Sequence, residues 1–194
     1  MCIIITNKKK LKEAYNIEKE LYIPNCSKIK EIRFWFTNEP IYMIWRFVKL
    51  LRKCEYIKNT NNGYISNIIL SFYRRRKNNL GMKLGLEIHE NCFDIGLHIY
   101  HGNIVVNSGV EVGKNCKMHG VNCIGNKAIS NQCPKLGDNI ELGFGAGIFG
   151  DVYIPSGCII GANSVVLKTP YKINSVLVGI PAKEKDSIKF YEKI

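Results

Sequence analysis

Aliphatic residues recur at every sixth position through the second half of the chain. One phase holds Val106, Val112, Met118, Ile124, Leu136, Leu142, Ile148, Ile154, Ile160 and Val166. A six-residue period fits neither an α-helix nor a simple alternating strand. It fits a three-sided coil in which each six residues form one short strand and eighteen form one turn. Residues 81–167 are therefore predicted to form a parallel β-helix, with the aliphatic side chains pointing inward.

The repeat is interrupted once and is absent at both ends. Between Ile124 and Leu136 the phase is kept, but Ser130 stands where an aliphatic residue is expected, so residues 126–134 are predicted to form a loop that leaves the coil. Residues 1–80 show no six-residue period and are predicted to be a mostly helical segment. Residues 168–194 are predicted to form a loop and a short helix. The expected fold class is mainly β.

Positive charge is concentrated in the N-terminal segment. The 194 residues carry a net charge of +12, and residues 1–80 account for +11 of it, with 17 Lys/Arg against 6 Asp/Glu. Residues 41–53 have the pattern of an amphipathic basic helix. Residues 28–77 could therefore contact an anionic membrane surface, an alternative to ordinary packing against the coil, while nucleic acid is a weaker candidate.

The location of the protein is predicted from its apolar stretches and its cysteines. The most apolar stretch, residues 41–51, is short and contains Arg46 and Lys49, so no spanning helix is expected. The charges at the N-terminus follow the apolar run, which is the reverse of a signal peptide. Eight cysteines follow neither a disulfide framework nor CxxC spacing, so reduced thiols are predicted. We expect a cytoplasmic protein, with contact at the inner membrane left open.

Two of the four histidines are separated by one predicted turn of the coil. His101 and His119 are eighteen residues apart, so we expect them to stack on one edge. Transfer of an acyl group from a thioester to an alcohol needs a base with a near-neutral pKa, and histidine is best suited. An isolated histidine is more often an ordinary surface or core residue, and the spacing is what makes this pair a candidate site.

A segment of the coil resembles the serine O-acetyltransferases, a branch of the hexapeptide-repeat acyltransferases. In GLHIYHGNIVVN, residues 96–107, His101 takes the place of the catalytic base of that family. The resemblance extends from Leu84 to Lys183. It implies a left-handed helix, acetyl-CoA as co-substrate, and a homotrimer with active sites between subunits; a hexamer stays open. Spacing alone does not give the hand, because parallel crossovers are ordinarily right-handed.

The resemblance also assigns roles to other residues. Glu87 matches the aspartate that orients the base, and His119 either replaces a missing second histidine or only lines the edge. Backbone amides beside the pantetheine arm and lysines beside the phosphates are expected to hold acetyl-CoA. The corresponding candidates are Gly145, Ala146, Ala162, Lys168 and Lys183. Gly145 is also demanded by the coil itself.

Two departures from the family pattern concern the acceptor. Tyr100 replaces the aspartate that holds the amino group of serine, and Gln132 replaces the arginine that clamps its carboxylate. A neutral acceptor explains these changes better than free serine, because a buried unmatched charge is expensive. The prediction is an O-acetyltransferase that acts on a small or carbohydrate acceptor, preferably a sugar of a surface polysaccharide precursor, with no resident metal.

Three alternatives remain open from the sequence. The first is a serine O-acetyltransferase of cysteine biosynthesis. The second is a metal-dependent hydratase of the γ-carbonic anhydrase type, in which His98, His101 and His119 would bind the metal. The third is a trimeric scaffold without catalytic activity.

Overall fold

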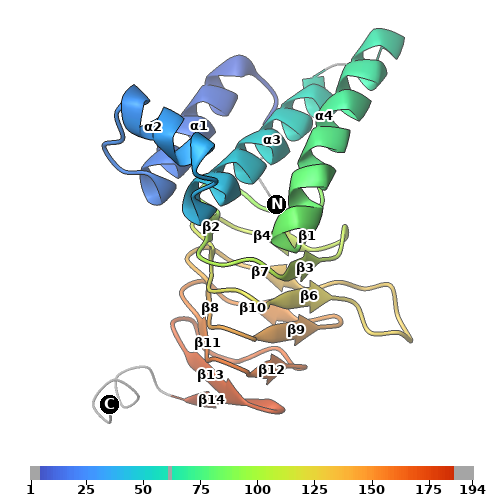
Figure 1. The fold of residues 1–194 in the computed structure, drawn as a ribbon. Helices are drawn as coiled ribbons and strands as arrows, with labels where there is room; N and C mark the ends of the chain where they lie inside the picture. Colours follow the sequence, from blue (N-terminus) through green and yellow to red (C-terminus); the bar gives the residue numbers. More distant parts are fainter. Residues whose placement is uncertain (1–4, 61–62, 186–194) are drawn as a thin grey trace.

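The computed structural model describes residues 5–60 and 63–185, and places a layer of helices on one end of a three-sided coil (Figure 1). The helices are α1 (Lys8–Tyr22), α2 (Lys28–Phe36), α3 (Pro40–Thr60) and α4 (Tyr64–Leu84). Side chains at their ends explain the boundaries. Asn7 and Ser27 accept hydrogen bonds from backbone N–H groups in the first turns of α1 and α2. Gly85 ends α4 in the left-handed conformation that glycine tolerates.

From β2 to β12, every third strand of the coil belongs to the same sheet, so the chain winds around three faces. The five-stranded sheet holds β1 (Leu86–Ile88), β3 (Ile104–Val106), β6 (Cys123–Gly125), β9 (Gly147–Phe149) and β12 (Val165–Val166). The three-stranded sheet holds β4 (Glu111–Val112), β7 (Lys135–Leu136) and β10 (Tyr153–Ile154). The six-stranded sheet holds β2 (His98–Ile99), β5 (Lys117–Met118), β8 (Glu141–Leu142), β11 (Ile159–Ile160), β13 (Val176–Gly179) and β14 (Ala182–Lys185). All pairs are parallel except β13 with β14.

The core of the coil is the aliphatic column predicted from the six-residue period. All ten in-phase residues are buried, none more than 5% exposed. Residues 126–134 contain no strand and lead away from the coil between β6 and β7 (Figure 1). Before Val106 in the chain the six-residue phase shifts, because the inward residues there are Ile88, Phe93 and Ile99. The spacing is five from Ile88 to Phe93, six to Ile99 and seven to Val106.

Two expectations about secondary structure are wrong. The chain is not mainly β, because more of the described residues are helical than extended. Residues 176–185, within the segment predicted to form a loop and a short helix, form a hairpin of β13 and β14 that extends the six-stranded sheet. The coil period could not predict this hairpin, because an antiparallel strand breaks the repeat. Residues 186–194, the rest of the segment predicted to form a loop and a short helix, lie outside the described residues.

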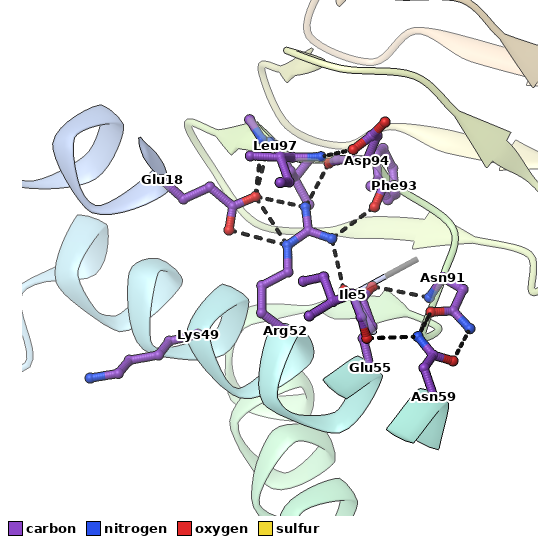
Figure 2. A network of polar contacts seen from close by, with 12 residues as sticks. Ile5, Glu18, Lys49, Arg52, Glu55, Asn59, Asn91, Phe93, Asp94 and Leu97 are labelled. Atoms are coloured by element: carbon purple, nitrogen blue, oxygen red, sulfur yellow. Dashed lines mark hydrogen bonds and ion pairs between the residues drawn. The ribbon is translucent and has the colours of Figure 1, made fainter. Parts of the chain in front are cut away.

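The helical layer closes the end of the first coil with buried charged side chains. Figure 2 shows the guanidinium of Arg52, on α3, between the carboxylates of Glu18 and Glu55. The same group donates to the backbone carbonyls of Phe93 and Asp94, each at 2.7 Å. Burial alone would lower the pKa of Arg52, but the two carboxylates outweigh it and raise that pKa. Arg52 is therefore charged, and it bonds helix and coil together.

The carboxylates and two further side chains bond other backbone groups of the first coil. Glu18 accepts from the N–H groups of Gly96 and Leu97, and Glu55 accepts from that of Asn91. The side chain of Lys77, on α4, donates to the carbonyl of Ile88 and to Glu90. The buried hydroxyl of Tyr22 donates to Leu97 and accepts from Ile99. We call these side chains, Glu18, Tyr22, Arg52, Glu55 and Lys77, the polar cap.

The basic helix predicted over residues 41–53 is part of α3 and packs inward. Ile44, Trp45, Phe47, Val48 and Leu51 are buried, and Trp45 contacts the ring of Tyr22. Its apolar face is therefore occupied by the protein itself and is not free for a membrane surface. Among the described residues, no helix is both long and apolar enough to cross a membrane.

Candidate active site

The predicted histidines lie where the six-stranded sheet turns into the five-stranded sheet. Four stacked turns form this edge, at residues 100–103, 119–122, 143–146 and 161–164, and we call it the histidine corner. Tyr100 and His101 come from the first turn, and His119 from the second. Gly145 and Ala162 lie in the third and fourth turns. The third turn also contains Ala146, so the coil brings six of the predicted site residues to one edge.

His101 occupies an extra residue in the first turn of this corner. Ile99 pairs with Met118 but Val105 pairs with Cys123, so the first turn is one residue longer than the second. The second turn makes room for it, because a Cβ on Gly120 would lie 2.8 Å from the Cβ of His101. Gly120 also has a φ of +119°, which side chains other than glycine rarely adopt. The side chain of His101 is exposed, and no described residue forms a hydrogen bond or ion pair with it.

The expected stacking of the two histidines is wrong by one residue. The ring of Tyr100, not that of His101, stacks on His119, with centroids 4.7 Å apart and an interplanar angle of 19°. His98 contacts the other members of this row, Tyr100 at 4.2 Å and Tyr22 at 5.2 Å between centroids. The longer first turn is the cause, since it displaces His101 from the position that an uninterrupted period of eighteen assigns to it.

A carboxylate that sequence analysis missed contacts His119. Nε2 of His119 lies 2.9 Å from Oε1 of Glu141 on β8, and Nζ of Lys117 lies 3.6 Å from the other oxygen. Burial, with the neighbouring Lys117 and His119, lowers the pKa of His98, which favours its neutral form. The sequence did contain a signal for Glu141: Lys117 and Glu141 each stand directly before an inward residue, on strands that pair.

Glu87 does not orient His101 within one chain. It lies exposed on β1 opposite Val105, and no described contact joins it to His101. It faces a groove of about 980 Å³ between α4 and the five-stranded sheet, which also contains His89. The groove is lined by Arg74 and Lys77 as well, but both of these cations are paired with Glu90.

Of the other predicted residues, Gln132, Lys168 and Lys183 lie outside the four turns of the histidine corner. Gln132 and Lys168 follow β6 and β12, on the side where the strands of the five-stranded sheet end. The histidine corner lies on the other side, where these strands begin. Lys183 is exposed on β14. Ala146 is fully buried, and its N–H and carbonyl both bond within the coil. Its predicted role stays a prediction, as do those of Gly145 and Ala162, whose turns reach the surface.

No group of three or more His, Cys, Asp or Glu is placed to hold a metal ion in the part of the chain that the structure describes. His98, Tyr100 and His119 form a row in which a tyrosine ring separates the two imidazoles. Nothing in the geometry of a single chain therefore favours the metal-dependent hydratase.

Curated proteins similar in sequence are acetyltransferases. A protein of Escherichia coli K12, provisionally named as the colanic acid biosynthesis acetyltransferase WcaB, is 38% identical over 90 residues, which cover 45% of this chain and 54% of that protein. A serine acetyltransferase of Buchnera aphidicola from Schizaphis graminum is 27% identical over 197 residues, covering 92% of this chain and 72% of its own length. The chain thus matches about half the length of the first of these relatives. No model of a known protein family matches the sequence.

Solved structures with the same fold are serine acetyltransferases. The enzyme of Brucella abortus superposes with a TM-score of 0.69 at 17% identity, covering 92% of this chain and 70% of that one. The enzyme of Neisseria gonorrhoeae in complex with serine gives a TM-score of 0.64 at 19% identity, with 92% and 70% coverage. At these identities the likeness establishes the fold alone. Together with the sequence matches it confirms the resemblance to hexapeptide-repeat acetyltransferases.

Proposed function

We propose that this chain is an O-acetyltransferase that uses acetyl-CoA and transfers the acetyl group to a hydroxyl of a sugar in a surface polysaccharide precursor. The proposal rests on a left-handed form of the coil, as the resemblance implies. The observation that carries it is the histidine corner, where His101 is exposed and free of hydrogen bonds within the described chain. The similarity to acetyltransferases supports acetyl transfer, and the provisional name of the Escherichia coli relative supports a polysaccharide acceptor.

The proposed reaction needs one base and no covalent enzyme intermediate. His101 takes the proton of the acceptor hydroxyl as its oxygen attacks the thioester carbonyl, and a C–O bond forms. The tetrahedral intermediate then collapses, the C–S bond breaks, and the imidazolium returns its proton to the leaving thiolate. Glu87 has no role in this scheme, because it does not contact His101 in the chain.

The surroundings of the corner favour a neutral acceptor. Tyr100 stands beside His101 without a charge, and the neighbouring cation Lys117 is already paired with Glu141. An amino acid bound here would find no free cation for its carboxylate among these residues, which would leave a desolvated charge unmatched. Serine stays the second candidate acceptor, because a serine acetyltransferase matches this chain over 92% of its residues.

The donor is proposed to lie along the lower turns of the same corner. The turns that hold Gly145 and Ala162 follow those of His101 and His119, so an extended pantetheine arm could run past them. Lys168 and Lys183 are both exposed and are the candidates for the phosphates. Because Lys168 and Gln132 lie at the opposite end of the five-stranded sheet, we propose a homotrimer in which a neighbouring copy brings these residues to His101.

The test is release of CoA thiol from acetyl-CoA by the wild-type chain, offered a panel of sugar acceptors and L-serine. We expect turnover on sugars, and a loss of at least about a hundredfold in His101→Ala, the usual contribution of a general base. His89→Ala is the matched control, because His89 is also exposed, lies on the first coil, and should keep full activity.

Two results would contradict the proposal. Turnover on serine alone, abolished in His101→Ala, would reassign the acceptor to an amino acid. Turnover on no acceptor, or equal turnover of the wild type and His101→Ala, would overturn the proposed function and favour the scaffold.

A further inference from the structure

We propose that His119 binds the acceptor and that Glu141 is the residue that positions it. The inference deepens the proposed function and rests on it. Of the two histidines at the corner, only His119 has a carboxylate partner among the described residues, with Nε2 of the ring 2.9 Å from Oε1 of Glu141. The carboxylate accepts the proton that Nε2 carries in a neutral ring.

This contact selects the tautomer of the neutral imidazole. A neutral histidine carries its proton on one ring nitrogen, and the nitrogen that bonds a carboxylate is the one that keeps it. Nδ1 is then the acceptor, and among the described residues no hydrogen bond to Nδ1 is present. A ring with one nitrogen held by a carboxylate and the other free is suited to accept a hydrogen bond from a hydroxyl group.

The ring is also held in place from another direction. Tyr100 stacks on it at 4.7 Å, and the side chain of His119 is 36% exposed, so the ring is ordered by its neighbours while part of it still faces solvent. Because Tyr100 directly precedes His101, the stacked pair lies next to the proposed base. The geometry points to a sugar hydroxyl bound at His119 while a second hydroxyl of the same sugar is deprotonated at His101.

The coil contains an internal comparison that separates this role from ordinary surface pairing. Glu111 on β4 and Lys135 on β7 are paired residues of the three-stranded sheet, and Nζ of Lys135 lies 3.9 Å from Oε1 of Glu111. That pair has no histidine contact, whereas Glu141 joins Lys117 and His119. The Glu111 pair shows what a glutamate does at such a position when it only pairs with lysine, and it supplies the control variant.

The experiment compares Glu141→Ala, Glu141→Gln and Glu111→Ala in the full chain. Loss of one hydrogen bond of about 1.4 kcal/mol corresponds to a tenfold change, so we expect Glu141→Ala to raise the KM for the sugar about tenfold. The KM for acetyl-CoA should stay unchanged. Glu141→Gln keeps an acceptor oxygen and should restore most of the affinity. Glu111→Ala should behave as the wild type.

A second readout does not depend on turnover. Nitrogen-15 NMR of the histidine rings reports which nitrogen carries the proton, and we expect His119 to be protonated on Nε2 in the wild type and in Glu111→Ala. In Glu141→Ala this preference should be lost. His119→Gln should raise the KM for the sugar, with a pH profile unchanged from the wild type.

Each contrary result has a distinct meaning. An unchanged ring form in Glu141→Ala, or an unchanged acceptor KM, would overturn the positioning role while leaving His101 as the base. A His119→Gln variant as inactive as His101→Ala, with its pH profile flattened, would overturn acceptor binding and make His119 the base. Absence of turnover on any acceptor in the wild type would instead overturn the proposed function, and with it the acceptor role of His119.

Discussion

The coil and the helical layer are stabilised by different interactions. Inside the coil the buried side chains are mostly apolar, and each strand pairs with the strands of the neighbouring turns above and below it. The first turn of the coil has no strands above it, so its outward-facing backbone N–H and C=O groups need other hydrogen-bond partners. The helices supply these partners through the polar cap, in which Arg52, Glu18 and Lys77 bond directly to the backbone of residues 88–97. An apolar helix face alone could not close that end, because it would leave the edge unpaired.

The strongest test of this difference is the removal of Arg52. Arg52→Leu leaves Glu18 and Glu55 buried and facing one another, and also unpairs the carbonyls of Phe93 and Asp94. We expect a loss of about 3–5 kcal/mol in the free energy of unfolding, measured by urea titration followed by circular dichroism. Lys49→Met, on the same helix but with its side chain directed away from the cap in Figure 2, should change stability by less than about 1 kcal/mol.

Two more variants keep this prediction testable even if Arg52→Leu does not fold. Arg52→Lys keeps the charge with fewer donors and should be destabilised less. Replacing Glu18, Arg52 and Glu55 together by Leu, Met and Leu should not restore stability, although buried ion pairs often tolerate such exchange. The reason is that the backbone groups of the first coil would stay unpaired. A triple variant as stable as the wild type would refute the role given to the polar cap.

In the coil, replacing one buried apolar side chain by another should change stability little, and only the loss of side-chain volume should destabilise the fold. Ile148 is fully buried and pairs with Ile124 and Val166 in the stacked column. Ile148→Ala should cost about 3 kcal/mol through the cavity it leaves, and Ile148→Val only about 1 kcal/mol. Tyr153→Ala, at an exposed position of β10, is the control. Thermal unfolding would measure all three, and a cost for Ile148→Val as large as that of Arg52→Leu would abolish the contrast between the regions.

The two regions also differ in how far the sequence predicts them. A repeat states the same requirement many times, so the aliphatic positions from Val106 to Val166 identify the coil. The polar cap has no period: Glu18, Arg52 and Lys77 look like surface residues in the sequence, and only the tertiary structure brings them to the end of the coil. The same limit applies at the candidate active site. The resemblance identifies His101 as the candidate base, but its displacement by one residue depends on a longer turn that the period does not predict.

Glu90 gives the cap a dependence on pH that the apolar core of the coil lacks. Burial acts to raise the pKa of Glu90, but hydrogen bonds and charges from Arg74 and Lys77 outweigh it and lower that pKa to about 2. A lowered pKa stabilises the folded state above the ordinary value near 4.5, and this contribution is lost as the pH falls toward 2. Because the Arg74 side chain is 40% exposed and solvent screens it, we expect about 2 kcal/mol.

The measurement is the urea midpoint between pH 5 and pH 2.5, for the wild type and Glu90→Gln. The amide should be less stable at pH 5, and its midpoint should fall less steeply with acid. Glu13→Gln, which replaces an exposed carboxylate on α1, should follow the wild type. Parallel curves for the wild type and Glu90→Gln would show that Glu90 does not link the cap to pH.

The smallest predicted effect is a gain in stability, at an exposed turn of the coil next to the proposed site. Val121 has a φ of +54° at the histidine corner, where the matching positions in other turns are Asn103, Gly145 and Asn163. A β-branched residue is strained in this conformation, which asparagine and glycine tolerate. Val121→Asn should therefore stabilise the chain by up to about 1 kcal/mol, a rise of about 2–4 °C in Tm. Val105→Asn is the matched control, because Val105 is equally exposed at 45% but lies in an extended strand, where asparagine is disfavoured. If both substitutions lower Tm, Val121 is not strained. A rise in Tm for Val121→Asn alone would show that Val121 is strained. The one corner turn without asparagine or glycine at this position would then hold its strain beside His119, where an acceptor would bind.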